Sequence, residues 1–144
     1  MFSRLRKLFT AADSGPRPAL PAGTRAYAVG DIHGRLDLYA ALADAIDADD
    51  AARDAAQTTV ILLGDLVDRG PDSAGVIAHA RAWAARRTVR LLTGNHEEMF
   101  LESLEKDEVL RHFLRFGGRE TVLSYPVDPE EYTRSDLAET RALM

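Results

Sequence analysis

Acidic, amide and imidazole side chains follow apolar segments at three places in the sequence, and these residue types can bind a metal ion. Asp31 and His33 follow the first apolar segment, Asp65 follows the second, and Asn95 and His96 follow the third. Carboxylates that lie close together repel one another, so a cluster of this kind requires a positive counter-charge. A divalent metal would supply it. Oxygen and imidazole ligands together favour manganese, iron or zinc over calcium or copper(I).

Arg69 lies in the same stretch as Asp65 and Asp68, within VILLGDLVDRGPDS at residues 60–73. An arginine cannot ligate a metal, but its fixed fork of N–H donors matches a phosphate group. A metal site beside such an arginine indicates chemistry on phosphate esters. The net charge of -5 gives little reason to expect a nucleic-acid surface. That charge does not exclude a small phosphorylated substrate.

The elements that must position these side chains follow an alternating pattern. Three runs, RAYAVGD, VILLGD and VRLLTGN, each end a strand-like segment with glycine and then aspartate or asparagine. Their nearly continuous apolar residues are typical of strands buried on both faces of a parallel sheet. Apolar residues at helical spacing lie between the runs, at Leu38, Leu42, Ala45 and Ile46 and at Val76, Ile77, Ala80, Trp83 and Ala84. We therefore predict an α/β fold that begins strand, helix, strand, helix, strand, with the three strands parallel.

This order would bring the polar residues together. In open α/β sheets, ligands bind beyond the carboxyl ends of the strands. The three Gly-Asp or Gly-Asn pairs all lie at those ends, so we expect their side chains to meet in one crevice. A single Gly-Asp pair is an ordinary turn signal. Three such pairs in register, two of them with a nearby histidine, favour a functional site over three unrelated turns.

Length and composition fit one folded domain without disulfides. The chain has 144 residues, of which 46% are apolar and 28% charged, and it contains no cysteine. No apolar run approaches the ~20 residues of a membrane span. The basic segment MFSRLRKLF is not followed by the apolar core of a signal peptide, and we expect a soluble, cytoplasmic protein. We assign residues 1–23 to this basic segment and a Pro-rich connector, and residues 24–144 to the folded domain.

Three motifs carry a resemblance to a known family. GDIHG at residues 30–34, GDLVDRG at 64–70 and GNHE at 94–97 resemble the N-terminal signatures of the calcineurin-like metallophosphoesterases. VDRG and NHE are similar to the phosphoprotein phosphatase branch, which includes bacterial serine/threonine protein phosphatases and diadenosine tetraphosphate hydrolases. The stretch RFGGRETVLSY at 115–125 is similar to the bacterial members. The resemblance covers about residues 25 to 126, and it implies the start of a fold with two sheets packed between helices.

The resemblance implies a phosphoric ester hydrolase with two divalent metals, in which a hydroxide that bridges the metals attacks phosphorus. It assigns the first metal to Asp31, His33 and Asp65. Asp65 would also bridge to a second metal that is held partly by Asn95. Manganese is the expected metal, ahead of iron and zinc. The implied substrate is a phosphoprotein or a dinucleoside polyphosphate, and serine/threonine protein phosphatase activity is favoured.

The resemblance also assigns roles to residues that do not bind metal. His96 would be the general acid at the leaving oxygen, Asp68 would orient His96, and Arg69 would hold the phosphoryl oxygens. We expect Glu97, at the start of a helical segment, to brace the loop. Two interpretations of Arg35 stay open, a contact with phosphate and a solvent-facing position at a helix start.

The match to the family is incomplete after residue 126. Members of the family supply two further histidines to the second metal, whereas the last histidine here is His112. We therefore expect a chain that holds the N-terminal part of the domain, with a second sheet largely missing and one incomplete metal site. An apolar sheet face and an unpaired strand edge would then favour self-association. The alternative is a truncated, catalytically impaired metal-binding or regulatory relic of the family.

Overall fold

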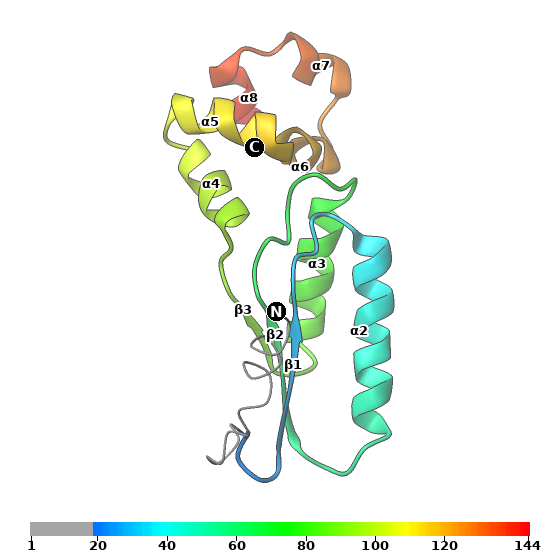
Figure 1. Cartoon of the computed structure of the whole chain (residues 1–144). Helices are drawn as coiled ribbons and strands as arrows, with labels where there is room; N and C mark the ends of the chain where they lie inside the picture. Colours follow the sequence, from blue (N-terminus) through cyan, green and yellow to red (C-terminus); the bar gives the residue numbers. More distant parts are fainter. Residues whose placement is uncertain (1–18) are drawn as a thin grey trace, which may run out of the picture.

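The computed structural model describes residues 19–144 and contains an α/β region followed by a helical region (Figure 1). Residues 1–18, which include the predicted basic segment, lie outside the described residues. The elements of the α/β region are β1 (Thr24–Val29), α2 (Leu36–Ala51), β2 (Gln57–Leu62), α3 (Ser73–Ala84) and β3 (Val89–Leu91). Within residues 19–144, no helix is both long and apolar enough to cross a membrane.

The sheet of the α/β region has the predicted topology. The strand order is β1-β2-β3, and both neighbouring pairs are parallel. The prediction of strand, helix, strand, helix, strand is therefore confirmed. Asp72 caps α3 by accepting a hydrogen bond of 2.7 Å from the backbone N–H of Gly75, as expected of an aspartate at this position.

One face of the sheet packs against α2 and α3. Val29, Val60 and Leu62 point to this face and are buried together with residues of both helices. The Trp83 indole on α3 also donates to the Asp47 carboxylate on α2, with N–O distances of 3.0 and 3.1 Å. Figure 1 shows both helices on the same side of the strands, to the right in this view, where this core lies between them and the sheet.

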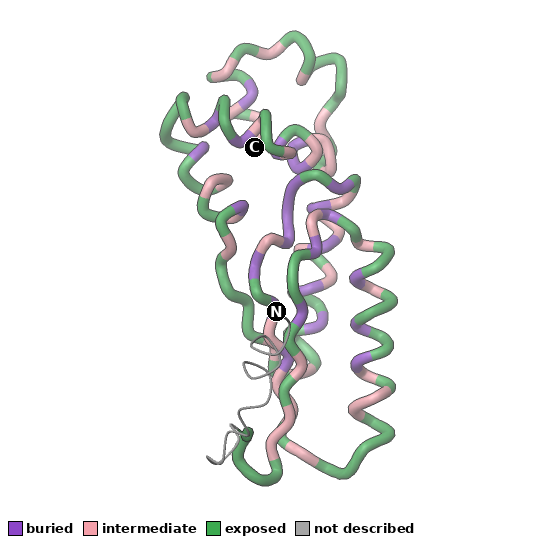
Figure 2. The backbone as a smooth tube through the Cα atoms, in the orientation of Figure 1, coloured by how far each residue is buried: buried purple, intermediate pink, exposed green. Residues whose placement is uncertain are grey.

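The buried side of α2 agrees only in part with the expected one, since Ile46 is buried as predicted but its expected companions are not. Tyr39, Ala43 and Ile46 are buried, at the spacing of one helical face, whereas Leu38 and Leu42 are exposed. Ala45, which was expected to share the apolar face, is exposed as well. The apolar pattern contained two overlapping stripes, and the stripe that begins with the aromatic Tyr39 faces the core. Figure 2 shows the buried positions of α2 recurring on one side of the helix.

Among the residues that the structure describes, the other face of the sheet is largely uncovered, so the prediction of strands buried on both faces is wrong for this part of the chain. Ala28, Ile61 and Arg90 form one row across the three strands, on the face away from Val29 and Leu62. Two residues further along, the exposed fractions of Leu63 and Leu92 are 50% and 51%.

The helical region is built around a second apolar cluster. Its buried residues are Leu110, Phe113 and Val122, and apolar side chains from α4 to α8 pack against them. Asp128 caps α7 (Pro129–Arg134) by accepting from the backbone N–H of Glu130 at 2.7 Å, and Pro129 occupies the first helical position. The elements of this region are α4 (Asn95–Ser103), α5 (Asp107–Phe113), the π-helical turn η1 (Leu114–Gly118), α6 (Arg119–Ser124), α7 (Pro129–Arg134) and α8 (Leu137–Leu143).

Candidate metal centre and phosphate site

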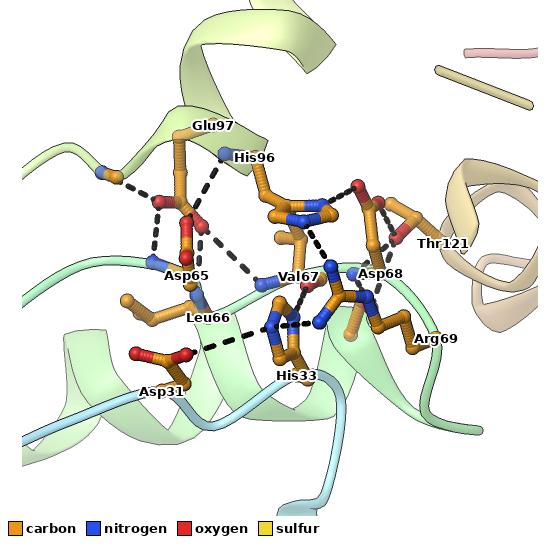
Figure 3. Close-up of polar contacts among 12 residues, drawn as sticks. Asp31, His33, Asp65, Leu66, Val67, Asp68, Arg69, His96, Glu97 and Thr121 are labelled. Atoms are coloured by element: carbon orange, nitrogen blue, oxygen red, sulfur yellow. Dashed lines mark hydrogen bonds and ion pairs between the residues drawn. The ribbon is translucent and has the colours of Figure 1, made fainter. Parts of the chain in front are cut away.

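The loops that follow β1 and β2 are joined by backbone hydrogen bonds at the carboxyl ends of the strands. The backbone N–H groups of Ile32 and His33 both donate to the carbonyl oxygen of Asp65, at 3.0 and 2.9 Å. The N–H of Gly34 donates to Leu66 in the same way, at 2.8 Å. These bonds bring the side chains of the first two motifs to one place (Figure 3).

Glu97 joins the loop after β3 to the loop after β2. Its carboxylate accepts hydrogen bonds from the backbone N–H groups of Asp65 at 2.8 Å, Leu66 at 2.7 Å and Gly94 at 2.9 Å (Figure 3). A fourth bond, from Val67, has a length of 3.3 Å. Hydrogen bonds to an ionised carboxylate are stronger than those between neutral groups. The prediction that Glu97 braces the loop is confirmed.

Backbone strain is concentrated among these residues. Within residues 19–144, four non-glycine residues have a positive φ, and all four were predicted to belong to the site: His33 at 44°, Asp65 at 52°, Asp68 at 72° and Arg69 at 68°. Each such conformation costs about 1–3 kcal/mol and persists only where surrounding contacts impose it. Strain of this kind, confined to polar residues at strand ends, indicates side chains held in position for a function.

Three side chains form a cluster of metal donors. One ligand atom from each of His33, Asp65 and His96 lies within 4.8 Å of the others. His33 Nδ1 lies 2.8 Å from the carbonyl oxygen of Val67, to which it can donate, and this places the lone pair of the ring on Nε2. Imidazole nitrogens and a carboxylate are suitable ligands for a divalent transition metal. The donor set therefore fits the predicted metal.

The other two predicted ligands lie at the margin of this cluster. Asp31 is 3.9 Å from His33 Nε2, and its side chain is 70% exposed. Asn95 is exposed at the first position of α4. The structure thus brings His33 and Asp65 together as predicted, places Asp31 beside His33, and adds His96, which was predicted as an acid rather than as a donor.

His96 and Asp68 form a buried pair. The side chain of His96 is 3% exposed and that of Asp68 is fully buried, and His96 Nδ1 lies 2.7 Å from Asp68 Oδ2. Burial raises the pKa of Asp68, and the hydrogen bonds from Thr121 and His96 oppose that rise. The pairing leaves His96 Nε2 directed away from Asp68 and towards the cluster, which is the arrangement predicted for an oriented acid.

The guanidinium of Arg69 spans the two imidazoles (Figure 3). Its Nη1 lies 2.9 Å from His33 Nε2 and its Nη2 lies 2.7 Å from His96 Nε2. Because arginine can only donate, we assign the ring protons of both histidines to Nδ1. The single lone pair of His33 Nε2 can bind either Arg69 or a metal. A metal ligated there would therefore release Nη1 of Arg69 for a phosphoryl group.

The sequence did not single out three residues that support the site. Thr121, on α6, lies 2.6 Å through Oγ1 from Asp68 Oδ1 and also accepts from the backbone N–H of Asp68 at 2.8 Å. Ser73 and Gly117 contact the same loop. Gly117 and Thr121 fall within RFGGRETVLSY, which carried a family resemblance but no spacing that would assign them a role.

Arg35 takes the second of its two predicted positions. It is the residue before α2, it is exposed, and its guanidinium contacts the Asp37 carboxylate at 2.6 and 2.8 Å. These contacts support a role at the helix start. Arg69 is consequently the arginine that the structure places at the metal donors.

Comparison with known proteins identifies the family. The family model for calcineurin-like phosphoesterases matches residues 24–134. The chain belongs to this family. The matched range contains every residue predicted for the site, and the parallel sheet with its helices is consistent with the start of the calcineurin-like fold.

Individual calcineurin-like relatives match shorter segments. A symmetrical bis(5'-nucleosyl)-tetraphosphatase of Yersinia pestis (strain Pestoides F) is 41% identical over 71 residues, which are 49% of this chain and 22% of the relative. The enzyme of the same name from Yersinia pseudotuberculosis serotype O:1b gives the same values. A crystal structure of a candidate diadenosine tetraphosphatase is 25% identical, has a TM-score of 0.45, and covers 73% of this chain and 47% of its own. The match thus spans about a fifth of the length of these curated relatives.

Proposed function

We propose that this chain carries the metal and phosphate site of a phosphoric ester hydrolase that depends on a divalent metal. The observation that supports this most strongly is the arrangement of three chemical groups at one sheet edge. Arg69 is hydrogen bonded to His33 and His96, and His96 to Asp68, while a carboxylate oxygen of Asp65 lies within 4.8 Å of the donor nitrogens of both imidazoles. In a calcineurin-like phosphoesterase, this set is suited to phosphate-ester hydrolysis.

The first metal would be held by His33 and Asp65, with Asp31 beside them, and Asn95 would contribute to a second. When bound, such metals supply a strong nucleophile from water near neutral pH and offset the charge of the phosphoryl group. Manganese is our proposed metal, ahead of iron and zinc, because carboxylates outnumber imidazoles among the predicted ligands. We expect the second site to bind weakly, since only Asp65 and Asn95 are assigned to it.

The side chains that do not hold metal would act on the two ends of the reacting bond. Arg69 presents two N–H groups, 2.9 and 2.7 Å from the imidazole nitrogens that they contact, and would donate these to phosphoryl oxygens. His96 would pass a proton from Nε2 to the leaving oxygen. Asp68, hydrogen bonded to Nδ1, would fix the ring and stabilise its protonated form.

For the substrate, we propose a dinucleoside polyphosphate ahead of a phosphoprotein. The support is the name of the relatives, which are symmetrical bis(5'-nucleosyl)-tetraphosphatases and share 41% identity over 71 residues. Serine/threonine protein phosphatase activity, the substrate class that the sequence motifs favoured, is our second candidate because VDRG and NHE are also similar to that branch.

Hydrolysis assays on the purified chain test both parts of the proposal. We expect manganese-dependent release of phosphate from p-nitrophenyl phosphate, abolished by EDTA, and higher kcat/KM on diadenosine tetraphosphate than on a phosphoserine peptide. Asp65→Asn should abolish turnover, whereas Asp44→Asn, the same change at an exposed position of α2, should not alter it. Metal-independent turnover, or equal activity in both variants, would contradict the proposal. A preference for the phosphoserine peptide would overturn only the order of the substrates.

A further inference from the structure

Two buried hydroxyl groups, of Ser73 and Thr121, form a series of hydrogen bonds that ends at the carboxylate of Asp68, the partner of His96. Ser73, at the start of α3, and Thr121, on α6, are 0% and 1% exposed, and their hydroxyl oxygens lie 3.0 Å apart. Thr121 Oγ1 lies 2.6 Å from Asp68 Oδ1, and His96 Nδ1 lies 2.7 Å from Asp68 Oδ2. Both oxygens of the Asp68 carboxylate are therefore bound by side chains of the helical region, one by His96 on α4 and one by Thr121 on α6.

In this series of hydrogen bonds, each hydroxyl group donates towards Asp68. Ionised Asp68 can only accept, so the hydroxyl proton of Thr121 goes to Asp68. Thr121 then has no proton left for Ser73, and Ser73 must donate to Thr121. The backbone N–H of Asp68 donates to both hydroxyl oxygens, at 3.1 Å for Ser73 and 2.8 Å for Thr121. Every polar group around Asp68 thus has a partner, which permits a fully buried carboxylate.

The segment that contains Thr121 also binds Arg69, the residue that follows Asp68 in the loop. The carbonyl oxygen of Gly117 accepts from the backbone N–H of Arg69 at 3.0 Å. Gly117 has a φ of +110°, and a Cβ at this position would lie 2.6 Å from the Arg69 nitrogen. Asp68 and Arg69, two consecutive residues with positive φ, are therefore each tied to the segment that contains Gly117 and Thr121.

We propose that Thr121 is a positioning residue for the reaction, which fixes the carboxylate of Asp68 and, through it, the imidazole of His96. This inference rests on the proposed function for its kinetic consequence. Without the hydroxyl of Thr121, Asp68 Oδ1 would be a buried acceptor without a side-chain donor, and the carboxylate would turn away from the orientation that His96 requires. The proton of His96 would then be presented less often to the leaving oxygen.

Kinetics on the full chain test this role. Thr121→Val keeps the volume of the side chain and removes its hydroxyl. We expect kcat on a phosphoserine peptide, which has a poor leaving group, to fall on the order of 10- to 100-fold at unchanged KM, the range for a lost hydrogen bond to a charged group. On p-nitrophenyl phosphate the loss should be smaller, and Thr121→Ser should restore both values. The matched control is Ser124→Ala, because the Ser124 hydroxyl binds the backbone N–H of Ala74 from the same helix without touching Asp68.

Nuclear magnetic resonance of the imidazole rings tests the same role without turnover. The chain has four histidines, so the Nδ1 proton of His96 can be assigned by comparison with His96→Asn. Thr121→Val should shift that resonance, while the ring signals of His79 and His112 stay in place. If Thr121→Val does not fold, Ser73→Ala, which removes the donor to Thr121, should give a smaller shift in the same direction.

The two measurements separate the inference from the function on which it rests. A wild-type chain without hydrolytic activity would contradict the proposed function, and the resonance of His96 would still decide the role of Thr121. An unchanged His96 resonance in the folded variant would overturn that role. Equal losses on both substrates would overturn it too, since they would indicate a general structural effect. An active wild-type chain with either result would leave the proposed function standing.

Discussion

The two regions of the molecule contribute to the site in different ways. The α/β region supplies His33, Asp65 and Arg69 from loops at the ends of its strands, next to the elements that position them. The helical region supplies His96 and Glu97 at the start of α4. It also supplies Thr121, which binds Asp68 although 53 positions of sequence separate the two residues. In this site, the reactive groups lie in short local motifs, whereas part of their support comes from a distant segment.

Within the helical region, the largest effect should come from His96, the group proposed as the acid. We expect His96→Asn to lower kcat on a phosphoserine peptide by about 10²- to 10⁴-fold, the usual contribution of a general acid, and to have less effect on p-nitrophenyl phosphate. His112→Asn, at an exposed position of α5, is the matched control. Stopped assays on both substrates provide the comparison. Equal losses on the two substrates would count against the acid role.

The core of the helical region gives the next largest effect. Phe113 is fully buried and stacks on Phe100 at a centroid distance of 5.3 Å. We expect Phe113→Ala to lower the free energy of unfolding by about 3–5 kcal/mol. Urea denaturation measures this change. Because α6 carries Thr121 and packs in the same cluster, the variant should also lose activity on the phosphoserine peptide. Full activity in this variant would show that the helical region does not support the site.

The hydrogen bonds that join Glu97 to the α/β region can be weakened without creating a cavity in either core. In Glu97→Gln, an amide N–H₂ group, which can only donate, would replace one of the carboxylate oxygens that now accept hydrogen bonds from backbone N–H groups. We expect a loss of about 1.5–3 kcal/mol of unfolding free energy and a lower affinity for manganese, because Asp65 lies among those donors. Glu98→Gln, an exposed neighbour on the same helix, should change neither value. Identical denaturation curves for the two variants would argue against the brace.

The smallest effect on stability should come from the open face of the sheet. Leu92 is 51% exposed there, so Leu92→Gln should change the free energy of unfolding by less than about 0.5 kcal/mol. We propose that this face drives self-association, and Leu92→Gln should then lower the average mass measured by light scattering. Leu42→Gln, at an exposed position on the outside of α2, is the control. The same mass for wild type and both variants would contradict association through this face.

The sequence predicted the α/β region better than the helical one. Continuous apolar runs that end in Gly-Asp or Gly-Asn indicated the strands and their order, because a parallel sheet gathers its loops at one edge. The contact of Thr121 with Asp68 could not be predicted, since no periodic pattern links positions 53 residues apart. On α2 the sequence correctly predicted that Ile46 is buried, but it favoured Leu38 and Leu42 over Tyr39 and Ala43. The two stripes are adjacent, and only packing against the sheet and α3 selects one.

Metal binding tests the central claim most directly, namely that the loops at the strand ends form a metal centre. Manganese can be counted by elemental analysis after gel filtration of the wild-type chain, of His33→Ala and of His112→Ala, a control outside the cluster. We predict one firmly bound equivalent in the wild type and in His112→Ala, a second equivalent only when manganese is present in excess, and no firmly bound metal in His33→Ala. A wild-type chain that retains no metal, or a His33→Ala variant that retains as much as the wild type, would contradict the account.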